Sequence, residues 1–160
     1  MEYNTQVLGV NVNLDYIFMN FEAQNDMDVI EKMAKNLNER GVVKDSFIPA
    51  ILEREKKFCT GLQFDEVGIA IPHTDTQHVN IPAISIAVLK KPLIFQGMGM
   101  PGTKVNVEIV FMLALKEAHS HMDFLQTLVT EFQSEGVLKN LIHSKSKAEL
   151  LNKFEMLFTK

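Results

Sequence analysis

The stretch Gly68-Ile69-Ala70-Ile71-Pro72-His73 sets a short apolar run against a proline and then a histidine. Proline cannot donate a hydrogen bond to a neighbouring strand, so this pattern predicts a β-strand that ends just before His73. Pro72 also fixes the backbone angle φ where a functional side chain needs a defined direction. Loops at strand ends carry many of the sites of α/β proteins. His73 is therefore a candidate nucleophile or ligand, although these residues alone are equally compatible with an inert surface histidine.

Further strands are expected on both sides of this stretch. Residues 83–89 (AISIAVL) and 105–115 (VNVEIVFMLAL) are rich in apolar, β-branched side chains, which predicts buried strands. Residues 10–22 alternate in part between apolar and polar side chains, which predicts an earlier strand. Residues 58–65 break the pattern and are expected to form a loop, and Pro101-Gly102 predicts a turn.

Helices are expected before, between and after these strands. Apolar side chains recur at helical spacing behind Asp26, which is a candidate N-cap, and Gly41 is placed to end that helix in the left-handed conformation. Similar patterns predict helices that begin at Asp45 or Ser46, at Ser120, at Val137 and at Ser146. The order of elements predicts an α/β domain with helices packed on a sheet.

The composition limits the classes of protein and partner. With 160 residues, the chain is expected to form a single domain over residues 1–160. A net charge of -4 argues against nucleic acid, and no apolar run reaches the ~20 residues needed for membrane insertion. Cys59 is the sole cysteine, which fits a reducing cytoplasm, and no positive cluster surrounds it in sequence to make it a nucleophile. The glycine-rich residues 97–102 lack the lysine of a phosphate-binding loop, so no nucleotide is expected.

Several other residues could carry chemistry beside His73. His119-Ser120-His121 opens a predicted helix, whose N-terminus favours anions and disfavours protonation of a nearby imidazole. Asp75 and His78 follow His73 closely, and such pairs can orient a ring, although spacing alone does not bring them together. Arg54 lies in the charged run of residues 53–57, where the sequence alone favours a solvated helix end over a phosphate-binding arginine.

Together, these residues resemble the fructose/mannitol-type IIA family of the phosphoenolpyruvate-dependent sugar phosphotransferase system. The resemblance runs over residues 14–158, and its pieces come in the family's order. They are the Arg-Glu segment of residues 52–55, Thr60-Gly61, the signature of residues 68–73, the long apolar strand and His121-Met122. The segments of residues 58–62 and 73–79 look most like the galactitol-specific branch, because Thr74 stands where mannitol and fructose members tend to have glycine.

The resemblance implies a three-layer α/β/α fold with a mixed sheet of about five strands. It implies that His73 accepts a phosphoryl group from phosphohistidine of the carrier protein HPr and passes it to a cysteine of the cognate IIB component. That component then phosphorylates sugar during uptake through the IIC permease, with no metal or nucleotide cofactor. Arg54 and His121 would assist at the phosphoryl group, with Thr60, Asp75 and His78 as possible supporting residues.

Two partners that dock in turn at His73 need an adaptable apolar rim, for which Phe58, Leu62, Met98 and Met100 are candidates, unless they belong to the core. Three alternatives remain open. The chain could be a regulatory IIA protein that signals by its phosphorylation state. It could be a hydrolase-like metal-binding domain that uses His73, His78, His119 and His121, although their spacing is loose. It could also be a structural interaction domain.

Overall fold

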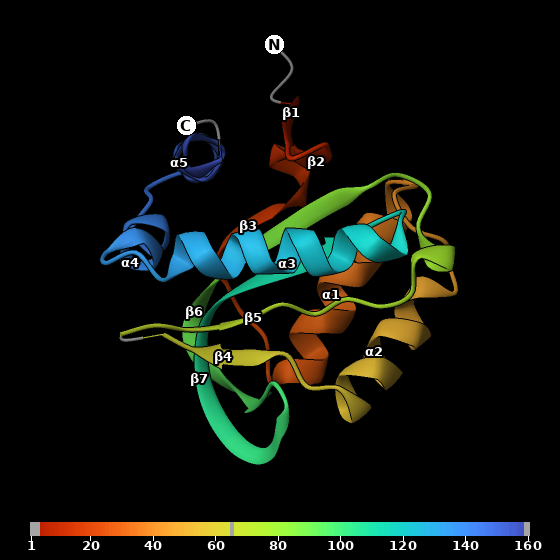
Figure 1. The fold of residues 1–160 in the computed structure, drawn as a ribbon, viewed down its shortest axis with the longest axis horizontal. Coiled ribbons are helices and arrows are strands. Elements are labelled where there is room, and N and C mark those ends of the chain that lie inside the picture. The colour runs from red at the N-terminus through yellow and green to blue at the C-terminus, as the bar shows by residue number, and fades with distance from the viewer. Residues whose placement is uncertain (1–3, 65, 159–160) are drawn as a thin grey trace.

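A computed structural model describes residues 4–64 and 66–158, which form one mixed β-sheet with helices on both faces (Figure 1). The strands are β1 (Asn4–Val7), β2 (Val10–Asn13), β3 (Ile17–Phe21), β4 (Gly61–Gln63), β5 (Gly68–Ala70), β6 (Ala83–Gly97) and β7 (Met100–Ala114). The helices are α1 (Asp26–Glu39), α2 (Phe47–Lys57), α3 (Ala118–Phe132), α4 (Val137–Ile142) and α5 (Lys147–Leu157), with short 3-10 turns η1 (Leu14–Tyr16) and η2 (Thr76–His78).

The long antiparallel pair β6–β7 is the centre of the sheet. Its register runs from Ala83 opposite Ala114 to Gly97 opposite Met100. On its outer sides β3 pairs parallel with β6, and β5 pairs parallel with β7. Strand β4 pairs antiparallel with β5, so that the two form a short hairpin beside β7. Because β5 is anchored to the centre of the sheet, the residues that follow it leave the sheet in a defined direction.

Alternation along the strands divides the core into two clusters, one on each face of the sheet. Ile84, Ile86 and Phe111 pack with α3, α4 and α5, whereas Ala87 and Val110 pack with α1 and α2. In Figure 1, α3 crosses in front of the sheet and α1 lies behind it. The expected three-layer α/β/α architecture with a mixed sheet is therefore confirmed.

The described part of the sheet has seven strands instead of the expected five or so. One addition is β4, which lies inside residues 58–65 where a loop was expected. A strand of three residues is too short to show alternation. Its first residue is a glycine, Gly61, because the backbone of β6 lies too close for a side chain there. A Cβ on Gly61 would lie 2.7 Å from the carbonyl oxygen of Gln96.

The predicted element boundaries are partly wrong. Asn25, and not Asp26, caps α1 through a side-chain oxygen that accepts the N–H of Asp28. Helix α3 begins at Ala118 instead of Ser120, and Pro101 lies inside β7 because the chain turns at residues 98–99. Ser146 caps α5 as expected, and Gly41 follows α1 with the expected positive φ of 75°.

Replacing Gly68 by alanine should destabilise the fold by about 1–3 kcal/mol. The added Cβ would overlap the carbonyl oxygen of Asn106 and lie 2.8 Å from Cγ1 of Val105, on the strand that β5 pairs with. Urea unfolding followed by circular dichroism measures the loss. Gly97→Ala is the matched control, because its Cβ would come no closer than 3.3 Å to Thr103. Equal losses in the two variants would contradict the steric argument.

Candidate functional site

The backbone on either side of Pro72 is held to the sheet just before His73. Strand β5 ends at Ala70, yet the N–H of Ile71 still donates to the carbonyl of Thr60 at 3.2 Å. The carbonyl of Pro72 accepts the N–H of Leu113 in β7 at 2.9 Å. Both Ile71 and Pro72 are buried, whereas His73 is half-buried. His73 therefore emerges from a fixed backbone, as the Ile-Pro-His pattern predicts.

The ring of His73 is oriented by its own backbone. Its Nδ1 lies 2.8 Å from the carbonyl oxygen of Ile71. A carbonyl oxygen can only accept, so Nδ1 carries the hydrogen, and in the neutral ring Nε2 is the nitrogen without a hydrogen. Nε2 is therefore the ring nitrogen that could act as a nucleophile.

The surroundings of His73 keep its ring neutral near pH 7. Burial lowers the pKa of His73 below its ordinary value of 6.5, and the positive charge of Arg54 lowers it further. The hydrogen bond to Ile71 acts in the opposite direction and does not cancel the effect of burial. Neutral imidazole is the form that attacks phosphorus, so the site favours the reactive state.

Arg54 lies in the last turn of α2, and two neighbours hold its guanidinium. Nη1 is 3.6 Å from Oδ1 of Asp75, and Cζ lies 4.9 Å from the centre of the Phe58 ring. Asp75 is largely exposed, so the ion pair contributes little to stability and is easily exchanged. The cation–π contact with Phe58 adds a second attraction, on the order of 0.5–1 kcal/mol at an exposed position. Arg54 and Asp75 thus lie together beside the loop that carries His73.

Thr60 and Glu55 join the end of α2 to the start of β4. The N–H of Thr60 donates to Oε2 of Glu55 at 2.9 Å, and its hydroxyl donates to Oε1 at 2.9 Å. Thr60 was a predicted supporting residue, but Glu55 was missed because it lies in a charged run. The spacing Phe47, Ile51, Glu55 was the available signal, since all three are buried on one face of the helix.

His78 lies at the end of the loop after His73, where its contacts are with the start of α2. Its Nδ1 is 2.8 Å from the hydroxyl oxygen of Ser46, and its carbonyl accepts the N–H of Lys44 at 2.8 Å. These bonds tie the turn η2 to the beginning of α2, whose other end carries Arg54. A role for His78 in holding this loop follows from its contacts.

The helix N-terminus that was expected to contain His121 is present as the first turn of α3. The side chains of residues 118–121, and with them the predicted site residues His119 and His121, lie outside the described residues. Among the side chains that the structure does describe, no three histidine, cysteine or acidic residues converge as metal ligands. Cys59 is a poor candidate nucleophile, because burial and the nearby Glu55 raise the pKa of its thiol.

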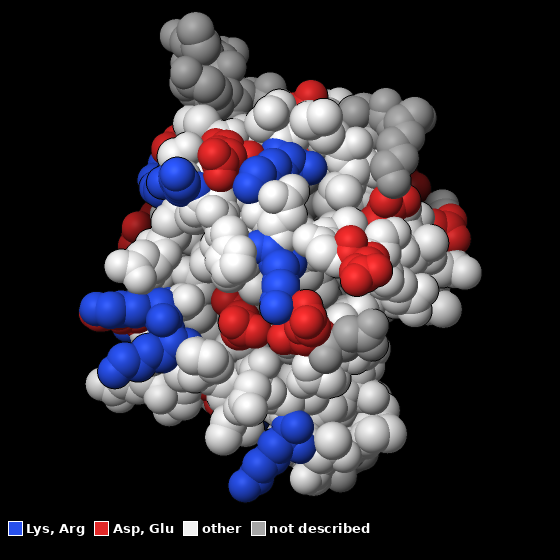
Figure 2. All heavy atoms as spheres, turned by 90° about the vertical axis from the view of Figure 1, so that its left-hand side faces the viewer, with Lys and Arg blue, Asp and Glu red and all other residues white. Residues whose placement is uncertain are grey.

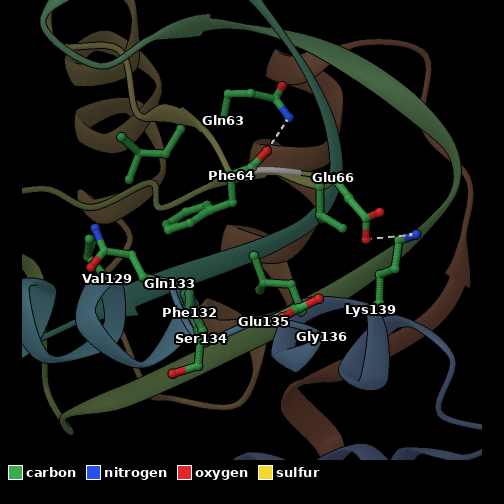
Figure 3. A pocket seen from close by; sticks show the side chains of 13 residues that line it. Gln63, Phe64, Glu66, Val129, Phe132, Gln133, Ser134, Glu135, Gly136 and Lys139 are labelled. Atoms are coloured by element: carbon green, nitrogen blue, oxygen red, sulfur yellow. Dashed lines mark hydrogen bonds and ion pairs between the residues drawn. The ribbon is translucent and has the colours of Figure 1, made fainter.

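A cavity of about 510 Å³ lies elsewhere, between the β4–β5 turn and the junction of α3 and α4 (Figure 3). Phe64 and Phe132 line it, and an ion pair of 2.9 Å between Glu66 and Lys139 crosses its edge. Residues of the turn between β4 and β5 line this cavity. His73 follows the other end of β5, which is the end away from that turn. This cavity is therefore separate from the histidine site.

The molecular face that carries α4 shows acidic and basic side chains side by side (Figure 2). Pairs such as Lys153–Glu149, at 3.2 Å, balance charge locally. This face offers no basic surface of the kind that binds nucleic acid. Among the described residues, no helix combines the length and the hydrophobicity that a membrane span requires.

Comparison with known proteins identifies the family. The model of the family described as "Phosphoenolpyruvate-dependent sugar phosphotransferase system, EIIA 2" matches residues 11–156. The chain belongs to this family. It is 32% identical over 142 residues to the mannitol-specific phosphotransferase enzyme IIA component of Staphylococcus aureus, and the match covers 88% of this chain and 92% of that protein. The chain is thus a IIA protein of the phosphotransferase system, of the fructose/mannitol type.

Solved structures of IIA proteins share the fold. Mannitol IIA of Escherichia coli, in its complex with phosphorylated mannitol IIB, superposes with a TM-score of 0.71 at 22% identity, covering 87% of this chain and 93% of that one. The nitrogen regulatory protein IIA-Ntr of Neisseria meningitidis superposes with a TM-score of 0.69 at 20% identity, covering 89% and 94%. A transport protein and a regulatory protein therefore have the same architecture as this IIA chain.

In a pH titration followed by NMR, the ring of His73 should have a pKa below 6.5, and Arg54→Gln should raise it. Removing a nearby positive charge makes protonation easier, which gives the sign. The control is Arg40→Gln, which removes an arginine paired with Asp15 on the surface at 3.3 Å. A pKa that stays the same in Arg54→Gln would show that the guanidinium does not act on this ring.

Glu55 should make stability depend on pH. Burial raises the pKa of its carboxyl from 4.5 to about 7, so the folded protein binds this proton more tightly than the unfolded chain. Its contribution is complete below pH 4.5 and is lost as the pH rises through about 7. Relative to Glu55→Gln, the wild type should therefore lose on the order of 2–3 kcal/mol across this range.

Urea unfolding of the two proteins at a series of pH values measures this difference, in which contributions from other groups cancel. Glu53→Gln serves as the control, because it removes an exposed charge from the same helix and should change stability by less than about 0.5 kcal/mol. A difference between wild type and Glu55→Gln that is independent of pH would contradict the raised pKa.

Proposed function

We propose that His73 carries a phosphoryl group on Nε2, accepts it from the phosphohistidine of HPr and passes it to a cysteine of the cognate IIB component. The observation that carries this proposal is the bond between Nδ1 of His73 and the Ile71 carbonyl, which places the hydrogen of the neutral ring on Nδ1 and leaves Nε2 unprotonated. A neutral, oriented imidazole beside an arginine is what reversible phosphoryl transfer needs.

In the first step, Nε2 of His73 attacks phosphorus while the P–N bond to the HPr histidine breaks. The ring of His73 then carries a positive charge, because Nδ1 keeps its hydrogen while Nε2 binds phosphorus. The carbonyl of Ile71 stabilises this charge through the same hydrogen bond that orients the neutral ring. In the second step, a thiolate of IIB attacks phosphorus, the P–Nε2 bond breaks and the ring returns to its neutral state.

Arg54 supplies the charge that phosphoryl transfer requires. A planar guanidinium can donate two parallel hydrogen bonds to phosphoryl oxygens. Without a phosphoryl group it is paired with the exposed Asp75, which a doubly charged phosphoryl group can displace. We assign to His121, on the strength of the family resemblance, a hydrogen bond to the phosphoryl oxygens, and to the first turn of α3 a favourable backbone dipole.

The apolar rim for the two partners would consist of Phe58 and Met100, which are 60% and 58% exposed. Met98 lies beside them, because its N–H donates to the carbonyl of Gly61 at 2.8 Å and brings the β6–β7 turn next to the start of β4. Leu62, which was also expected in the rim, packs against the core on the side of α3. Flexible methionine and an exposed aromatic ring suit successive partners with different surfaces.

The sugar is a separate part of the proposal, because a IIA protein hands its phosphoryl group to another protein and does not contact sugar. The galactitol-like segments around His73 and the likeness to mannitol-specific relatives agree on a sugar alcohol. We therefore propose sugar-alcohol uptake through a IIC permease, with galactitol as the first candidate. We further propose that residues 1–160 act as one domain in the cytoplasm, where HPr is found.

The proposal predicts an acid-labile phosphate on the purified protein after incubation with phosphoenolpyruvate, Enzyme I and HPr. Intact-mass analysis should show one added phosphoryl group on the wild type and none on His73→Ala. Arg54→Gln and His121→Ala should be labelled about 10²–10³ times more slowly, because each removes one stabilising donor. His143→Ala is the control for loss of a histidine and should be labelled at the wild-type rate.

Absence of label on the wild type, while a known IIA protein is labelled in the same mixture, would contradict the carrier role and favour a structural domain. Transfer of the label to a galactitol IIB, but not to mannitol or fructose IIB, would support the galactitol branch. Labelling by HPr without transfer to any IIB component would favour the regulatory alternative.

A further inference from the structure

Glu55 is a buried carboxyl group that the transfer mechanism above does not use. Its side chain is 4% exposed, and no other acidic or basic side chain in the described part of the chain is buried to this degree. It directly follows Arg54 in the last turn of α2. Burial of a carboxyl group is costly unless its oxygens accept hydrogen bonds, so its contacts are informative.

Thr60 provides these contacts. Its N–H donates to Oε2 of Glu55 at 2.9 Å, and its hydroxyl lies 2.9 Å from Oε1 and 3.1 Å from Oε2. The bonds span the short connection of residues 58–60 between α2 and β4. We call this pair of residues the Glu55–Thr60 clamp.

The clamp is connected to the nucleophile through two further hydrogen bonds. The carbonyl of Thr60 accepts the N–H of Ile71 at 3.2 Å, and the carbonyl of Ile71 accepts the Nδ1 hydrogen of His73 at 2.8 Å. A shift of Thr60 therefore moves the carbonyl that orients the ring of His73.

The clamp is connected to Arg54 as well. The loop that it closes contains Phe58, whose N–H donates to the Arg54 carbonyl at 2.7 Å and whose ring lies against the guanidinium. One pair of side chains thus fixes both the nucleophile and the cation that faces the phosphoryl group.

We propose that Glu55 is a positioning residue for phosphoryl transfer, and that its ionised form, bound to Thr60, sets the relative position of His73 and Arg54. This inference rests on the proposed carrier function of His73. Glu55 touches neither the phosphoryl group nor the ring, so it acts through Thr60, Ile71 and Phe58.

The charge of Glu55 can change near neutral pH. Burial raises its pKa to about 7, the bonds from Thr60 oppose this, and Asp26 at the start of α1 adds to the rise. The Cys59 thiol also faces this carboxyl, which helps to raise the pKa of the thiol. When Glu55 is protonated, its hydrogen bonds with Thr60 are no longer strengthened by a negative charge on the carboxyl, so the clamp loosens. The rate of phosphoryl transfer should therefore rise with pH through about 7.

The test is the single-turnover rate of transfer from phospho-HPr, measured between about pH 5.5 and 8.5. Glu55→Gln and Thr60→Val should lower the rate at the upper end about tenfold, leave the KM for phospho-HPr within about twofold, and remove the rise near pH 7. Both should keep the loss of rate at lower pH that comes from protonation of His73. Thr60→Ser, which retains the hydroxyl, should restore the rate to within about threefold of wild type.

Glu53→Gln is the matched control, because it removes an exposed charge two residues away on the same helix and should behave as wild type. The proposal is overturned if Glu55→Gln has the rate and pH profile of Glu53→Gln, or if it slows transfer but keeps the rise near pH 7. If Glu55→Gln does not fold, the two Thr60 variants carry the test, since they leave the carboxyl in place. Thr60→Val with an unchanged rate and profile would then overturn it.

A second measurement separates this inference from the carrier function. The ¹⁵N shift of His73 Nδ1 should show an inflection near pH 7 in the wild type and in Glu53→Gln, and none in Glu55→Gln. If the wild type accepts no phosphoryl group but shows this inflection, the carrier function fails while the coupling of Glu55 to His73 stands. If the wild type is labelled but the inflection is absent or persists in Glu55→Gln, the positioning role fails alone.

Discussion

The direction of the His73 ring depends on two backbone hydrogen bonds that hold the chain on either side of Pro72. The N–H of Ile71 donates to the carbonyl of Thr60, directly before β4, and the carbonyl of Pro72 accepts the N–H of Leu113 in β7. Proline adds a fixed φ between these two anchors. The carbonyl of Ile71 thereby accepts the Nδ1 hydrogen of the ring, and this bond decides which nitrogen of the neutral ring is unprotonated. The sheet thus orients the imidazole of His73 through the carbonyl of Ile71.

Much of the structure around His73 could be predicted from the sequence, because it depends on patterns of neighbouring residues. The apolar run before Pro72 predicted the strand and the position of His73 just beyond its end, and buried runs predicted β6 and β7. Strand β4 could not be predicted, since three residues show no period and its first residue, Gly61, also pairs with Gly97 of the distant strand β6. The number of strands was underestimated for the same reason.

Glu55 shows where local interpretation fails. A run of five charged residues at a helix end is usually solvated, and four of these five are not buried. The remaining one, Glu55, falls on the buried face of the helix because it lies four residues after Ile51 and eight after Phe47. Its partner, Thr60, belongs to the next element, so no pattern within the helix reveals what satisfies the carboxyl. The helical spacing indicates that Glu55 lies on the buried face, but only the tertiary structure shows that Thr60 is its partner.

Adjacent positions on a helix point about 100° apart, and α2 uses this property at its last turn. Arg54 turns outward to Asp75 and Phe58, and Glu55 turns inward to Thr60. The outward contacts are weak enough to exchange, because an exposed ion pair contributes at most about 1 kcal/mol. The inward contacts are buried and cannot be replaced by water. The same turn thus combines Arg54, whose side chain can exchange its partner as the proposed transfer requires, with Glu55, whose buried contacts hold the backbone of that turn in place.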